Sequence, residues 1–170
     1  VNRAREIKLG FGTGTKMNDT SISVPKFFLG MSPEHLRALR ELSAYSEFGS
    51  GDVIFREGSP ANSFYLIGHG KVALEADMNG QGLVQIGVLN DGAPLGWSWL
   101  FPPHIWHFHA RALKRTTMTH FDAEILRRLC ESDHDLGYEL MKRMSEVMLG
   151  RLQATRNELL SLYSKDMSGN

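Results

Sequence analysis

Residues 51–72 read GDVIFREGSPANSFYLIGHGKV, a stretch in which short apolar runs alternate with turns that carry glycine. The alternation continues past residue 72, where further apolar runs are separated by Asn79-Gly80 and by Asn90-Asp91-Gly92. Apolar runs of this length, bounded by such turns, predict β-strands. Turns that recur about every ten residues are typical of an antiparallel sandwich, roll or barrel.

Helical patterns flank this region on both sides. Ser32-Pro33-Glu34 combines a capping residue, a first-turn proline and an acid, which predicts a helix over about residues 33–45. After Asp122, a potential N-cap, apolar residues at helical spacing predict a short helix to Cys130 and a long one over about residues 135–163. Asp133 or Asp135 is the predicted cap of the long helix.

The composition excludes several classes of protein. The 170 residues suffice for one domain with a proper core, and 19 Lys+Arg balance 19 Asp+Glu, so no strong field attracts nucleic acid or an anionic membrane. No apolar run is long enough to span a membrane. A single cysteine, Cys130, excludes an intramolecular disulfide and a cysteine-cluster metal site. We expect a cytoplasmic protein whose residues 1–20 are disordered or were added by cloning.

The stretch from Gly51 to Val72 closely resembles the first half of the cyclic nucleotide-binding domain of Crp/Fnr regulators. The shared pattern is Gly51-x-x-Ile54-Phe55-x-Glu57-Gly58-x-x-Ala61-x-x-Phe64-Tyr65-x-Ile67-x-x-Gly70-x-Val72. Its glycines fall where a β-roll must reverse between strands, and glycine adopts positive φ without strain. The resemblance covers about residues 30–163. With the patterns above it implies an α+β fold, an antiparallel β-roll (double-stranded β-helix or jelly roll) flanked by an N-terminal helix and a long C-terminal helix.

The second half of the pattern, the phosphate-binding cassette, departs from the family. There the resemblance implies a Gly-Glu-x-x-Leu turn that opens a short helix, a Glu that binds the ribose and an Arg that pairs with the phosphate. Gly96, Leu100 and Ala110-Arg111-Ala112 match this cassette. Trp97 stands at the position of the Glu, and Trp106 stands at that of the Arg.

These two replacements remove the polar contacts that a cyclic nucleotide needs. Indole carries no charge and only donates hydrogen bonds. Losing both contacts weakens binding by roughly two to four powers of ten. We therefore expect no tight binding of cAMP or cGMP and no cofactor. The helix N-terminus after Gly96 remains as a potential anion site.

The cassette still defines a candidate ligand pocket, with two open interpretations. The tryptophans either rebuild the pocket for an unidentified small ligand or plug it. Thr155, on the long helix, falls where the family contacts the purine, although the simpler interpretation is a small residue in a helix seam. The candidate pocket residues are Gly96, Trp97, Ser98, Trp99, Leu100, Trp106, His107, Phe108 and Thr155.

Three histidines, His104, His107 and His109, support an alternative function as a cupin-like metal or substrate binder. An H-x-H pair on a strand puts both imidazoles on one face. The spacing does not fit such a metal site, because no carboxylate follows before Asp122. Strand alternation instead places His107, His109 and Arg111 on the solvent face and Trp106, Phe108 and Ala110 inside.

The long terminal helix carries an apolar stripe of Met141, Met144, Met148, Leu152, Thr155, Leu159 and Leu162. We expect a homodimer through this helix, because the stripe exceeds what a small β core covers; folding back on its own roll is the alternative.

The sequence contains no catalytic motif, so we expect a non-enzyme. Only 7 residues follow Tyr163, where many Crp/Fnr regulators carry a helix-turn-helix module. We therefore expect a stand-alone sensory or regulatory module that does not bind DNA and that acts on a protein partner.

Overall fold

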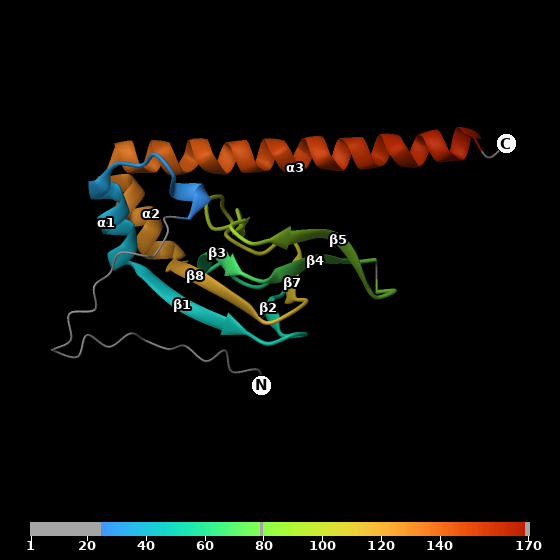
Figure 1. Ribbon diagram of the computed structural model, residues 1–170, viewed down its shortest axis with the longest axis horizontal. Helices are drawn as coiled ribbons and strands as arrows, with labels where there is room; N and C mark the ends of the chain where they lie inside the picture. Colours follow the sequence, from blue (N-terminus) through green and yellow to red (C-terminus); the bar gives the residue numbers. More distant parts are fainter. Residues whose placement is uncertain (1–24, 79, 169–170) are drawn as a thin grey trace.

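The computed structural model describes residues 25–78 and 80–168 of the chain. Within these ranges, eight strands form two antiparallel sheets, with strand orders β1-β8-β3-β6 and β2-β7-β4-β5. Two short helices lie beside one end of the sheets, and a long helix runs lengthwise past them (Figure 1). The predicted α+β class, with a β-roll between an N-terminal helix and a long C-terminal helix, is confirmed. The prediction for residues 1–20 lies outside the described residues.

The elements follow the predicted order. The strands are β1 (Ser43–Phe48), β2 (Val53–Phe55), β3 (Ser63–His69), β4 (Lys71–Asp77), β5 (Leu83–Asn90), β6 (Pro94–Leu95), β7 (His109–Ala112) and β8 (Thr116–Asp122). The helices are the 3-10 turn η1 (Lys26–Phe28), α1 (Pro33–Glu41), α2 (Ala123–Ser132) and α3 (His134–Ser168).

Side-chain caps begin the three α-helices where the sequence predicts them. Ser32 Oγ accepts a hydrogen bond from the backbone N–H of His35 at 3.1 Å. At the starts of α2 and α3, the carboxylates of Asp122 and Asp133 each accept a hydrogen bond from the backbone N–H three residues further on, at 2.9 Å and 3.0 Å. Each cap satisfies an N–H group that has no partner inside its helix.

The first helix is shorter than its apolar pattern predicts. It ends at Glu41 instead of continuing to Tyr45, because residues 43–48 pair with β8 as strand β1, in a register that starts at Ser43↔Phe121. Tyr45, predicted as part of the helix stripe, is exposed on that strand. Sheet hydrogen bonds with a distant strand thus override a local helical pattern.

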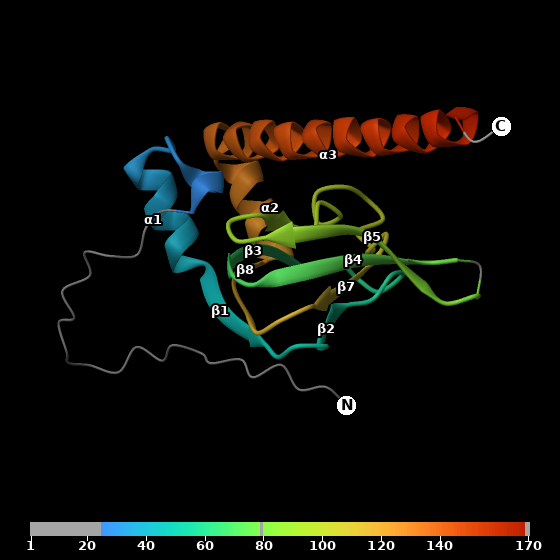
Figure 2. The ribbon, with the colours of Figure 1, turned by 45° about the vertical axis from the view of Figure 1, so that its right-hand side comes forward.

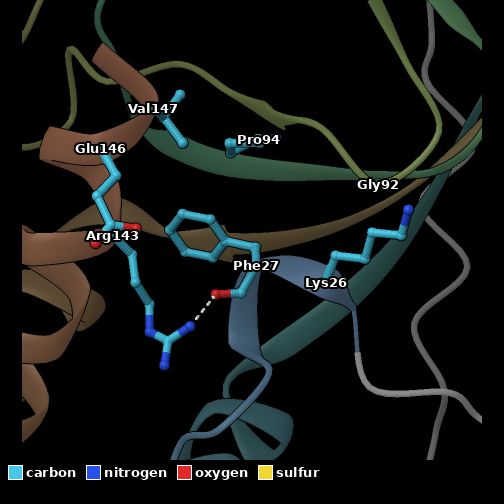
Figure 3. A pocket seen from close by; sticks show the side chains of 7 residues that line it. All are labelled: Lys26, Phe27, Gly92, Pro94, Arg143, Glu146 and Val147. Atoms are coloured by element: carbon cyan, nitrogen blue, oxygen red, sulfur yellow. Dashed lines mark hydrogen bonds between the residues drawn. The ribbon is translucent and has the colours of Figure 1, made fainter. Parts of the chain in front are cut away.

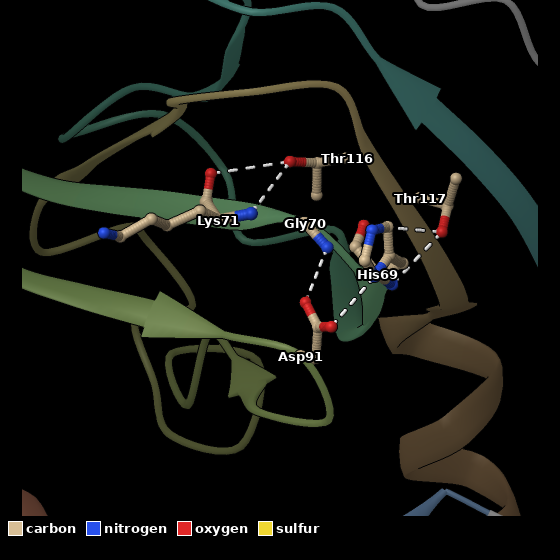
Figure 4. A network of polar contacts seen from close by, with 6 residues as sticks. All are labelled: His69, Gly70, Lys71, Asp91, Thr116 and Thr117. Atoms are coloured by element: carbon tan, nitrogen blue, oxygen red, sulfur yellow. Dashed lines mark hydrogen bonds and ion pairs between the residues drawn. The ribbon is translucent and has the colours of Figure 1, made fainter.

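The turn between β3 and β4 requires its glycine. Gly70 has a φ of +146°, and a Cβ there would lie 2.3 Å from Thr116 Oγ1. Asp91 Oδ1 accepts a hydrogen bond from the Gly70 N–H at 2.7 Å, while His69 Nδ1 lies 2.9 Å from Asp91 Oδ2 (Figure 4). The turn glycine predicted from the family pattern is therefore confirmed as a backbone requirement.

Buried side chains form two clusters. The roll core lies between the sheets, and its buried members are Phe48, Phe55, Ala61, Ile67, Val72, Leu74, Leu95, Trp106, Phe108, Ala110, Ala112 and Met118. The helical core joins the helices to the outer face of one sheet, and its buried members are Phe27, Phe28, Met31, Leu39, Phe64, Leu66, Trp99, Phe121, Ala123, Leu126, Leu136, Leu140 and Met144. Trp97 packs against both.

Of residues 134–164 of α3, only the N-terminal half contributes to these cores. Leu136, Leu140 and Met144 are buried, whereas all side chains of residues 152–164 are exposed. A second view shows the same lengthwise course of α3 past the sheets (Figure 2). Among the described residues, no helix combines the length and the apolar character needed to cross a membrane.

Candidate ligand pocket

The cassette segment begins at Gly96, directly after β6. Gly96 is buried and has a φ of +91°. Residues 98–100 then form a turn, in which the Leu100 N–H donates to the Trp97 carbonyl oxygen at 2.9 Å, and no helix follows. Pro102 and Pro103 explain this, since proline lacks an N–H group and disfavours helical geometry in the preceding residue. The expected helix N-terminus after Gly96 is therefore wrong, and the predicted anion site loses the helix on which it was based.

Trp106 fills the interior of the roll beside this turn. Its side chain is 3% exposed and stacks on Phe55, with ring centroids 3.7 Å apart and planes at 9°. A Cβ added at Gly96 would lie 2.4 Å from Cζ3 of Trp106, so the indole occupies the space directly above the glycine. Backbone hydrogen bonds with Gly58 and Ser59, at 2.8 Å and 2.9 Å, fix its position.

Two further predicted residues join this cluster of rings. Phe108 is buried, 5.7 Å from Phe55 between centroids. Trp97 meets Phe108 edge to face, at the same centroid distance of 5.7 Å. Edge-to-face and stacked rings at such distances attract one another beyond their burial. The structure thus joins Trp106 and Phe108 through Phe55, which the pocket prediction omitted, and Trp97 is joined to them through Phe108.

Trp99 and Leu100 belong to the other core. Trp99 is fully buried in the helical core, 5.5 Å from Phe64, and Leu100 packs against the same cluster. The Trp99 carbonyl oxygen accepts a hydrogen bond from Arg127 Nη1 of α2 at 2.8 Å. Trp99 therefore belongs to the helical core and Trp106 to the roll core, while Trp97 packs against both.

The histidines contact different partners. His107 is exposed, with Nδ1 3.0 Å from the buried Ser98 Oγ, whereas Nε2 of the partly buried His109 lies 3.9 Å from a Glu57 carboxylate oxygen. His104 is held through its backbone, accepting from the Ala61 N–H at 2.8 Å. The predicted alternation along residues 106–111 is confirmed. In the described part of the chain, no three His, Cys, Asp or Glu side chains are grouped to hold a metal ion.

Thr155 does not reach the cassette, because its side chain is exposed on α3. Arg151, one turn earlier on α3, contacts the cassette segment instead. Its Nη2 donates to the Pro94 carbonyl oxygen at 2.6 Å, and its guanidinium carbon lies 5.5 Å from the centre of the Trp97 ring. Burial lowers the pKa of Arg151. The signal for Arg151 was its position four residues before Thr155, hence on the same helix face.

A hollow of about 360 Å³ lies outside the roll, between α3, η1 and the segment before β6. Its lining residues are Lys26, Phe27, Gly92, Pro94, Arg143, Glu146 and Val147 (Figure 3). Arg143 Nη1 donates to the Phe27 carbonyl oxygen at 2.9 Å across one side of this space. None of the predicted pocket residues lines it.

This architecture coincides with a known family. The family model of the cyclic nucleotide-binding domain matches residues 45–133, from β1 to the end of α2. The chain belongs to the cyclic nucleotide-binding domain family. The resemblance stated from the sequence is thereby confirmed, and the chain is a domain of a family whose structural relatives include regulators and sensors.

Solved structures agree with this membership. A protein from Geobacter metallireducens, designated as cyclic nucleotide-binding, is 29% identical with a TM-score of 0.68, over 75% of this chain and 92% of its own. The sensor domain of the transcriptional regulator DNR from Pseudomonas aeruginosa is 20% identical with a TM-score of 0.61, over 75% and 85%. The catabolite activator protein of Thermus thermophilus is 22% identical with a TM-score of 0.64, over 80% and 62%. No curated protein matches the sequence.

Proposed function

We propose that this cyclic nucleotide-binding domain is a regulatory module that binds neither cAMP nor cGMP tightly, because its own rings occupy the ligand's place. The position of Trp106 carries the proposal. A ligand phosphate must approach the backbone of the turn at Gly96, and the buried indole covers that glycine. Of the two open interpretations, this geometry favours the plugged pocket.

The charges near the cassette support the same conclusion. The phosphate-binding Arg is replaced by Trp106, and Arg111, which follows on the next strand, already pairs with Glu75 at 3.1 Å and donates to the Gly51 carbonyl oxygen at 3.2 Å. A phosphate would have to displace this carboxylate to gain the arginine. Charge-assisted hydrogen bonds supply much of the affinity for a phosphate, so a cassette with Trp106 in place of the arginine, and with Arg111 already paired, binds one poorly.

Calorimetric titration of the full chain with cAMP and with cGMP tests the proposal. We expect no binding of micromolar affinity or better. The double variant Trp97→Glu and Trp106→Arg, checked for folding by circular dichroism, restores both family residues, and we expect it to bind more tightly than the unchanged chain. A micromolar or lower Kd for the unchanged chain would contradict the proposal.

The exposed half of α3 supports a homodimer as part of this function. Leu152, Leu159 and Leu162 recur at spacings of seven and three residues, and they are 67%, 52% and 56% exposed. The alternative, in which this stripe folds back on its own roll, is wrong for residues 152–164, since all are exposed. Identical stripes are self-complementary, so we propose that a second copy of the helix covers this one. A protein partner and a cytoplasmic location stay predictions.

A further inference from the structure

Within residues 134–164 of α3, Arg151 is the last residue that is not exposed. Before it, Leu140, Met144 and Val147 pack against the helical core. After it, all side chains of residues 152–164 are exposed. The direction of the C-terminal half of the helix relative to the roll therefore depends on what Arg151 contacts.

Arg151 contacts the cassette next to the hollow that separates α3 from the roll. The hollow lined by Arg143, Val147 and Pro94 lies between α3 and the roll one to two turns before Arg151. Arg151 then donates to the Pro94 carbonyl oxygen at 2.6 Å, and its guanidinium lies over the Trp97 ring. A planar guanidinium suits this double contact, since it donates hydrogen bonds in its plane and stacks on an aromatic face.

The contacts of Arg151 with Pro94 and Trp97 include no ion pair with a carboxylate. Among the described residues, no Asp or Glu lies within ion-pair distance of Arg151. A partly buried cation held by a carbonyl dipole and a ring, with no carboxylate partner, gains less from docking and competes with its own hydration in water. Its neighbour Gly150 is exposed inside the helix, with nothing within 4 Å of a Cβ placed there. Glycine weakens a helix at such a position, and glycines are common sites of helix bending.

We propose that Arg151 is a latch that holds the C-terminal half of α3 against the cassette turn without a ligand, and that α3 bends at Gly150 when the latch opens. Trp97 is the other half of the latch. Its ring also contacts Phe108, which continues through Phe55 to Trp106, so a rearrangement of the roll interior reaches α3 along one chain of rings. The proposal goes beyond the proposed function and does not depend on nucleotide affinity.

Hydrogen–deuterium exchange of the ligand-free full chain tests the latch. Arg151→Gln removes the stacked cation, and Arg156→Gln is the matched control, because Arg156 is exposed on the same helix. We expect Arg151→Gln to raise exchange about tenfold or more in residues 93–100 and 147–156, and Arg156→Gln to change neither. Trp97→Ala is expected to act like Arg151→Gln. All variants are compared at one protein concentration, so that any dimer protects α3 equally.

The hinge has its own readout. In the Arg151→Gln background, Gly150→Ala is expected to restore protection in residues 147–156 while leaving residues 93–100 exchanging fast. Equal exchange in Arg151→Gln and Arg156→Gln would overturn the latch. So would a rise spread evenly over β3, β8 and α2, since that is a general loss of stability. Unchanged exchange on adding Gly150→Ala would overturn the hinge.

Discussion

The ring of Trp106 lies flat on the ring of Phe55, 3.7 Å away between centroids and at 9° between planes. Phe55 belongs to the stretch that matches the family, whereas Trp106 stands where the family has an arginine. An arginine at this position would place a charge among apolar side chains, and it is stable there only when an anion accompanies it. The uncharged indole needs no such partner, so the interior of the roll is filled by the protein's own side chains.

Shortening Trp106 should cost the domain much of its stability. We expect Trp106→Ala to lower the free energy of unfolding by about 3–5 kcal/mol, because it removes a buried ring and leaves a cavity. Urea denaturation followed by circular dichroism measures this. Ile105→Ala is the control, as its side chain is partly exposed on the neighbouring position. Similar losses for the two variants would show that the ring is not part of a packed core; if Trp106→Ala does not fold, Trp106→Phe replaces it.

Two glycines of α3 should respond oppositely to alanine. A Cβ at Gly137 would lie 2.7 Å from the Cys130 carbonyl oxygen of α2, so Gly137→Ala forces the two helices apart and destabilises. Gly150 has open space around it, and Gly150→Ala should stabilise by about 0.5–1 kcal/mol through helix propensity. Thermal unfolding midpoints of both variants check the prediction, which fails if the two shifts have the same sign.

The Cys130 thiol should be nearly inert in the folded domain. Burial, followed by the charges of Asp133 and Glu131, raises its pKa to about 11. Because the thiolate is the reactive form, we expect alkylation near pH 8 to run roughly a hundredfold slower than in the unfolded chain. The rate should keep rising with pH until about pH 11. Iodoacetamide labelling followed by mass spectrometry, with and without urea, measures both. Equal rates in the two states would contradict the burial of this thiol.

Charging the exposed stripe of α3 should dissociate the proposed dimer without unfolding the protein. Leu152→Glu and Leu159→Glu place carboxylates on side chains that are 67% and 52% exposed in the single chain. Sedimentation velocity should show a dimer for the unchanged chain and a monomer for the double variant. Ile125→Glu on α2 is the control, since it is 47% exposed and lies outside the stripe. A monomeric unchanged chain would refute the dimer.

Features that depend on neighbours in the chain could be predicted from the sequence. The caps at Ser32, Asp122 and Asp133 and the turn at Gly70 each satisfy a local requirement, an N–H group without a partner or a positive φ. The resemblance to the family selected the roll from the sandwich, roll and barrel that the spacing of the turns allowed. The same local reasoning failed for residues 43–48, because their strand conformation comes from pairing with β8, in a register that runs from Ser43↔Phe121 to Phe48↔Thr116.

The sequence by itself therefore determined the roll, its turns and the loss of the charged cassette residues, since each is written in residue type and spacing. Only the tertiary structure decided where the tryptophans go. Trp99, in the turn, packs in the helical core, whereas Trp106, after the two prolines, packs in the roll core. It also decided that Arg151, not Thr155, meets the cassette, through a hydrogen bond that joins residues 57 positions apart. Helical spacing puts Arg151 and Thr155 on one face of α3, but which of the two makes the contact depends on how the helix packs against the roll.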